Sequence, residues 1–124
     1  MIAYTMVGTN DLDRATAFYD ALLAEIGGKR AMDLDGAILY AGAEGAPIFC
    51  ICTPADGNPA SVGNGSMIAF AAKDPAEVDR LYARAIELGA TDAGKPGARS
   101  RSGFDFYAAY FRDPDGNKFN FISM

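Results

Sequence analysis

Apolar side chains recur at helical spacing in two stretches of the chain. Steps of three and four residues place such side chains on one face of a helix. The first set is Ala15, Phe18, Leu22 and Ile26, and the second is Val78, Leu81, Tyr82, Ala85 and Leu88. The pattern therefore predicts two amphipathic helices, one in each half of the chain.

Start and stop signals flank both predicted helices. Asn10-Asp11 offers a short acceptor side chain as a cap for the first. Asp74, Pro75 and Glu77 combine an N-cap, a proline at the first helical position and a capping-box acid for the second. Glycines follow both helices, Gly27-Gly28 in one case and Gly89 in the other. Because glycine adopts the left-handed conformation easily, these positions predict the helix ends.

Short apolar runs between turn-forming residues predict strands. In the first half they are 2–7, 29–34, 37–42 and 47–53, and in the second half 66–72, 104–112 and 118–123. Residues 54–65 are rich in turn formers and are predicted to link the halves, and 90–103 are predicted to form a loop. Asp113-Pro114-Asp115-Gly116-Asn117 predicts a tight turn whose aspartates act as caps.

The two halves repeat each other. Asp11 and Phe18-Tyr19 recur 63 residues later as Asp74 and Leu81-Tyr82. The chain therefore predicts an α+β domain built from tandem βαβββ modules, 1–57 and 66–124, joined by a link at 58–65. The second strand of the second module has no clear pattern of its own. A groove between repeated units is a common place for a small ligand.

The composition excludes several kinds of chemistry and several kinds of partner. The chain has no histidine, which removes the commonest general base and metal ligand. Its net charge of −5 argues against nucleic acid as a partner. No apolar run is long enough to cross a membrane. The first residues already follow a strand-like pattern, so we expect no signal peptide. We expect a cytoplasmic protein.

Cys50 and Cys52 are the two cysteines. On a strand, residues two apart point to the same side, and a disulfide across one residue would be strained. Two thiols without histidine make a poor zinc site. We therefore expect two reduced, buried cysteines.

Three segments together resemble the vicinal oxygen chelate superfamily, which includes glyoxalase I, bleomycin-resistance proteins and extradiol dioxygenases. They are the Asp11…Phe18-Tyr19 opening, Pro96-Gly97 with Arg99, and 113–117 before the last strand. The resemblance implies that the paired modules form a cup between their sheets. In many members this cup holds a divalent metal, and dimers complete it, so we expect a homodimer.

The family's four metal-ligand positions, which usually carry His, Glu or Gln, fall on Tyr4, Ile51, Met67 and Asn120. None of these residues matches the pattern, and hard cations need several charged oxygens. The resemblance therefore predicts a member without the metal and without another cofactor. In this register Cys50 and Cys52 flank Ile51 and face away from the cup, toward a helix.

A cup lined by these four residues, with Tyr107 or Phe104, suits reversible binding of a small, mostly apolar molecule. Arg99, in a loop without acids, is placed to receive an anionic group or to brace the loop. No catalytic residue is assigned. One alternative is a glyoxalase-like lyase that uses Tyr4 or Tyr107 as an acid. Another is a structural or regulatory domain whose cup is filled by its own side chains.

Overall fold

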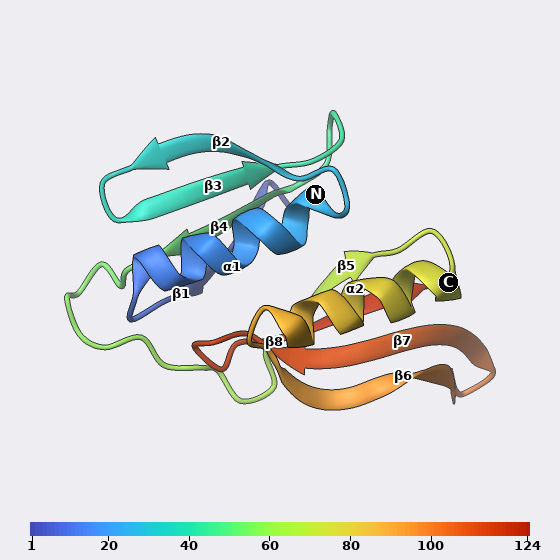
Figure 1. Ribbon diagram of the computed structural model, residues 1–124. Coiled ribbons are helices and arrows are strands. Elements are labelled where there is room, and N and C mark those ends of the chain that lie inside the picture. Colours follow the sequence, from blue (N-terminus) through green and yellow to red (C-terminus); the bar gives the residue numbers. More distant parts are fainter. The chain divides into compact units, whose positions relative to one another are not determined.

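The computed structural model describes residues 1–124, which form two compact units, Met1–Val62 and Gly63–Met124. Each unit has the order β-α-β-β-β (Figure 1). The first contains β1 (Tyr4–Gly8), α1 (Leu12–Ala24), β2 (Lys29–Leu34), β3 (Ala37–Ala41) and β4 (Ile48–Cys52). The second contains β5 (Ile68–Ala71), α2 (Pro75–Glu87), β6 (Thr91–Arg101), β7 (Phe104–Arg112) and β8 (Lys118–Ser123). The predicted α+β class and the predicted order of elements in the first half are confirmed.

In the first unit, the strands lie in the order β1-β4-β3-β2, with β1 and β4 parallel and the other pairs antiparallel. One face of this sheet packs against α1 (Figure 1). The ring of Tyr19 on the helix lies 4.9 Å from that of Phe49 on β4 and 6.4 Å from that of Tyr40 on β3. These rings, with Leu22 and Ile51, form a core that excludes water.

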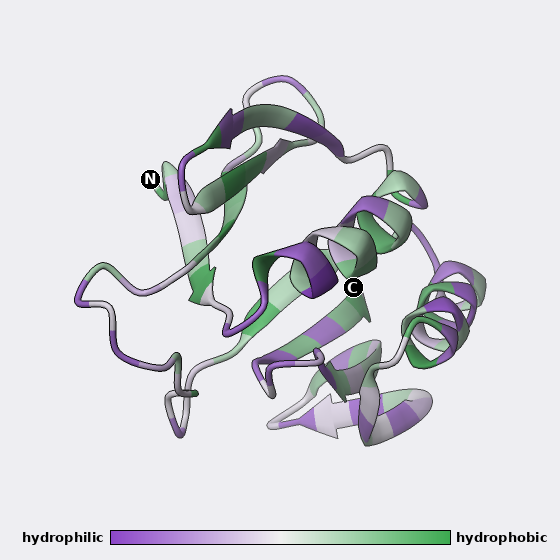
Figure 2. Ribbon diagram, turned by 60° about the vertical axis from the view of Figure 1, so that its left-hand side comes forward, coloured by the Kyte–Doolittle hydropathy of each residue, from purple (hydrophilic) through white to green (hydrophobic).

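The second unit repeats this arrangement, with the order β5-β8-β7-β6 and β5 parallel to β8. Its core is a cluster of phenylalanines on the sheet, covered by Val78, Leu81 and Ala85 of α2. The ring of Phe111 lies 5.5 Å from that of Phe119 and 5.0 Å from that of Phe121. Both helices accordingly carry hydrophobic and hydrophilic stripes (Figure 2).

The repeated residues have the same structural roles in both units. Asp11 accepts a hydrogen bond from the backbone N–H of Arg14 at 3.0 Å, and Asp74 accepts one from that of Glu77 at 2.8 Å. Gly27 and Gly89, with φ of 79° and 110°, occupy the left-handed region after the two helices. The predicted caps and helix ends are confirmed, and both helices have 13 residues.

The prediction of a loop at 90–103 is wrong, because Thr91–Arg101 forms the strand β6. This strand lies at the edge of its sheet, where a proline can sit without removing a ladder hydrogen bond. Its pairing with β7 is interrupted on both sides of Gly94. The bulges break the alternation of apolar and polar residues that would otherwise mark a strand in the sequence.

No helix in the chain is both long and apolar enough to span a membrane.

Candidate functional site: the sheet faces turned away from the helices

Each sheet has one face that packs on the helix of its own unit, termed the helix face, and an opposite face, termed the open face. Alternation along the strands assigns every strand residue to one of them. In the first sheet, Phe49 belongs to the helix face because its ring contacts Tyr19. Ile51, two residues on, lies on the same face and is fully buried. The prediction that Ile51 lines the open side is therefore wrong by one residue.

The same register determines the sheet face on which the two cysteines lie. Cys50 pairs with Met6 and Leu39, so it lies on the open face together with Cys52, and the prediction that they face the helix is wrong. The error arose because a strand that is apolar at every position, as Ile48–Cys52 is, has no alternation to fix its register. Both thiols are free, and burial raises the pKa of each.

The open face of the first sheet carries large apolar side chains that reach solvent. Tyr4 is 58% exposed and Met6 51%, both on β1. Met32 is 56% exposed and Leu34 51%, both on β2. Met6, Cys50, Leu39 and Met32 form one row across the four strands. Tyr4 is thus accessible, as its predicted role requires.

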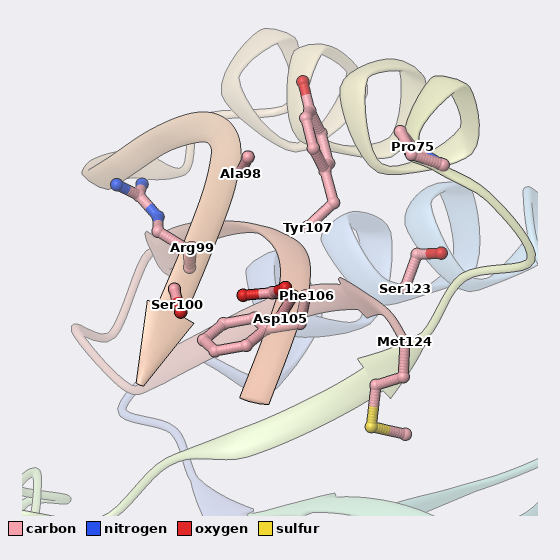
Figure 3. Close-up of a pocket in the computed structure, with 9 residues that line it drawn as sticks. All are labelled: Pro75, Ala98, Arg99, Ser100, Asp105, Phe106, Tyr107, Ser123 and Met124. Atoms are coloured by element: carbon pink, nitrogen blue, oxygen red, sulfur yellow. The ribbon is translucent and has the colours of Figure 1, made fainter. Parts of the chain in front are cut away.

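Tyr107 lies on the helix face of the second sheet. Its hydroxyl points to α2 (Figure 3) and donates a hydrogen bond to Asp79 Oδ1 at 2.8 Å. That bond raises the pKa of Tyr107. The prediction that Tyr107 lines the open side is therefore wrong. A phenol that already donates to a carboxylate is also poorly placed to act as an acid in catalysis.

Figure 3 shows a pocket at the end of the second sheet, where the β6–β7 hairpin, the end of β8 and the start of α2 meet. It has a volume of about 560 Å³, and its lining includes Arg99, Asp105, Phe106 and Tyr107. The remaining predicted residues, Tyr4, Ile51, Met67 and Asn120, do not line it.

The open face of the second sheet gathers polar groups around one ring. Tyr110 pairs with Asn120 across β7 and β8, and Lys118 lies two residues before Asn120 on the same face. Arg99 Cζ lies 5.8 Å from the centroid of the Tyr110 ring, and Lys118 Nζ lies 5.7 Å from it. Arg99 also donates from Nη2 to the Lys95 carbonyl at 2.7 Å. Arg99, Tyr110, Lys118 and Asn120 together make up the Tyr110 cluster.

Asn120 is the most confined member of the Tyr110 cluster. It is 2% exposed, and its Oδ1 has no hydrogen-bond donor. Met67 immediately precedes β5, and continued alternation from Ala69, the partner of Asn120, assigns it to the same face. Sequence reasoning had named Asn120, Met67 and Arg99 but missed Tyr110 and Lys118. Alternation back from Asn120 and pairing across the 113–117 turn would have found both.

That turn is built as predicted. Asp113 Oδ1 accepts from the backbone N–H of Asp115 at 3.0 Å and from that of Asn117 at 2.9 Å. Asn117 Nδ2 donates to the other carboxylate oxygen at 3.0 Å. Asp113 thus caps the turn that sets the register of β7 against β8.

The side chains present do not fit a divalent metal ion. No three Cys, Asp or Glu side chains are grouped so that they could hold a metal ion. Among the open-face positions already named, the oxygen donors are one amide and phenols, and the sulfur donors are two thiols with raised pKa values and thioethers. Two thiols with neutral oxygen and thioether donors do not supply the histidines, further thiolates or carboxylates that zinc and hard cations need.

The comparisons agree with this fold. Residues 1–121 match the family described as Glyoxalase/Bleomycin resistance protein/Dioxygenase superfamily, and the chain belongs to that family. A solved glyoxalase/bleomycin resistance protein from Albidiferax ferrireducens T118 is 40% identical, with a TM-score of 0.90 and 98% of each chain covered. A lactoylglutathione lyase from Agrobacterium tumefaciens is 24% identical, with a TM-score of 0.70, covering 98% of this chain and 92% of that one. No curated protein matches the sequence.

Proposed function

We propose that this family member binds a small, mostly apolar molecule reversibly on an open sheet face, without a resident metal ion. The observation that carries the proposal is the Tyr110 cluster, in which a buried, unpaired amide oxygen lies beside an aromatic ring on the face away from the helix. A buried polar atom without a partner costs free energy, and a ligand that supplies a donor recovers it.

The surroundings of the Tyr110 cluster support an apolar ligand body. Phe106 and Ala108 precede Tyr110 at alternate positions of β7, and Ile122 follows Asn120 on β8. Phe104 and Phe106 have their ring centroids 5.7 Å apart and extend this aromatic surface along the strand. Ligand sites are typically apolar with a few placed polar groups, which matches this composition.

A lyase of the glyoxalase type receives less support from the residues. The phenol of Tyr107 is engaged with Asp79 on the helix face, and no group of three His, Cys, Asp or Glu side chains is placed to hold a metal ion. Without a metal or an acid–base pair, neither the polarisation nor the proton transfer of such a reaction has an assigned residue.

Native mass spectrometry of gently purified, tag-free protein tests the proposal, because it reports metal, bound organic mass and subunit number in one measurement. We expect a homodimer that carries no divalent ion and, when bound molecules survive purification, an added organic mass. One divalent ion per chain that resists chelation would overturn the metal-free proposal. Added mass that disappears on mild denaturation would support reversible binding.

A further inference from the structure

We propose that the Tyr110 cluster is a site for a small aromatic carboxylate that also carries a hydroxyl or amino group. This inference rests on the proposed function and specifies the chemistry of the ligand. It assigns the carboxylate to Arg99 and Lys118, the aromatic body to the ring of Phe106, and the donor group to Asn120 Oδ1.

The cations of the Tyr110 cluster differ from the ion-paired arginines of this acidic chain. Arg30, Arg80 and Arg84 each form an ion pair with a carboxylate, within 3.3 Å at most. Arg99 and Lys118 instead flank a single tyrosine ring. Lys118 also lies directly opposite Arg112 across β7 and β8. Like charges opposite each other are destabilising, so an anion bound between them is favoured.

The second sheet places no carboxylate on the open face to neutralise these cations. Its strands contain two acidic residues, Asp92 and Asp105. Asp92 accepts a hydrogen bond from Tyr82 of α2, and Asp105 alternates with Phe106 to the face that Tyr107 shares. The open face therefore presents cations alone among its charged strand residues, although the whole chain has a net charge of −5.

The ring of Tyr110 lies close to the β6 backbone at Gly94. A Cβ added at Gly94, its partner on β6, would come within 2.9 Å of the Tyr110 ring. The absence of a side chain at Gly94 thus leaves room for that ring against the β6 backbone. Arg99 and Lys118 lie over this ring, 5.8 and 5.7 Å from its centroid, so the ring holds both cations near the place where a ligand's carboxylate would bind. Arg99 uses one donor for the Lys95 carbonyl and keeps others for the ligand.

Asn120 determines which polar group the ligand must carry besides its carboxylate. Its Oδ1 accepts no hydrogen bond, and its neighbours on the open face are Tyr110 and Lys118, so the ligand bound there must bring its own donor. A hydroxyl or amino group on the ring satisfies Oδ1, whereas a bare hydrocarbon would leave it unpaired. Sites built around a polar group discriminate strongly against ligands that lack the matching group.

Three probes of nearly the same size separate these roles: 4-hydroxybenzoate, benzoate without the hydroxyl, and methyl 4-hydroxybenzoate without the charge. Their dissociation constants are measured by NMR titration of the full chain, which also follows the side-chain amide signals of Asn120. We expect 4-hydroxybenzoate to bind tightest and to shift those signals. Arg99→Gln and Lys118→Met should each weaken the two carboxylates about tenfold and leave the ester unchanged.

Arg84→Gln on α2 is the matched control, because it removes the same charge from a different surface of the unit. Arg99→Lys keeps the charge and should recover part of the affinity. Equal affinity for the ester and the carboxylates, unaffected by Arg99→Gln, would overturn the inference and leave the proposed apolar binding intact. Failure of all three probes to bind would overturn the inference alone, because the proposed function does not require an aromatic carboxylate. An effect of Arg84→Gln equal to that of Arg99→Gln would show general charge attraction and overturn the site.

Discussion

The edge strands β2 and β6 both contain arginine, and Arg30 on β2 and Arg99 on β6 take opposite directions. Arg30 on β2 turns to the helix face, where Nε donates to Asp20 Oδ1 at 2.9 Å. Arg99 on β6 turns to the open face and lies over Tyr110. The open face of the first sheet presents large exposed apolar groups. The open face of the second sheet presents cations around a tyrosine ring.

This difference separates the parts of the fold that the repeat preserves from those it leaves variable. Caps, helix lengths and the helix-face core recur because both units must bury one side of a sheet. The open faces have no such shared constraint, so their residues diverge. Residues that differ between the units at open-face positions are therefore the better candidates for ligand contacts.

The largest loss of stability is expected from substitution of Ile51. Its place on the helix face makes it part of the core of the first unit and not part of a ligand site. Ile51→Ala should lower the free energy of unfolding by about 2–5 kcal/mol, because it leaves a cavity in a fully buried position. Met6→Ala, on the half-exposed open face, is the control and should cost about 1 kcal/mol or less. Urea denaturation measures both. Equal losses would mean that Ile51 does not belong to the helix face of β4.

Removing the ion pair that holds Arg30 on the helix face should cause a smaller loss of stability, and this loss should depend on pH. Arg30 and the Tyr40 hydroxyl both donate to Asp20, and the Arg30 bond holds the pKa of Asp20 below its usual value. This stabilisation is full above the unfolded-state pKa near 4 and is lost as pH falls through the lower folded-state value. Asp20→Asn should cost about 1 kcal/mol at pH 7, discounted for partial exposure.

Unfolding free energies of the wild type and Asp20→Asn at pH 7 and at pH 2.5 check this expectation. The gap between them should narrow at the lower pH, since the stabilisation by the Asp20 charge is lost as the wild-type carboxylate takes up a proton. Asp33→Asn, which removes only the 3.3 Å contact to Arg30, is the control and should have a smaller effect. A gap that stays constant with pH would contradict the assigned role of the Asp20 charge.

The sequence predicts the frame of this fold well and the open faces less well, for a physical reason. Helices, caps and turns leave local signals, as at Asp11, Asp74 and Asp113, and these were predicted. Side-chain direction depends on register, which a uniformly apolar strand such as β4 does not encode. Ile51 and the cysteines were therefore assigned to the wrong faces. β6 was missed because bulges and a proline hide its alternation.

Removing the two helix caps tests whether the repeated aspartates are equivalent, and the expected loss of stability is intermediate in size. Asp11→Ala and Asp74→Ala should each lower stability by about 1 kcal/mol, because each leaves a first-turn N–H without its acceptor. In the second unit Glu77 Oε2 also accepts from the Lys73 N–H at 2.8 Å, which completes a capping box. A cost at Asp74 that clearly exceeds the cost at Asp11 would show that the two caps are coupled differently to their units. Thermal denaturation monitored by circular dichroism measures both variants.

The smallest stability effect is expected at Tyr4, and it bears on the open face of the first sheet. Tyr4 is more than half exposed, so Tyr4→Phe should change the unfolding free energy by no more than about 0.5 kcal/mol. Affinity is the informative readout. When the phenol donates to a bound molecule, its loss should weaken binding by about 1 kcal/mol, roughly fivefold. An unchanged dissociation constant for 4-hydroxybenzoate, combined with a loss in Arg99→Gln, would assign binding to the Tyr110 cluster without the Tyr4 phenol. A loss in Tyr4→Phe alone would instead place the ligand's polar contact on the apolar face and reverse the comparison between the two units.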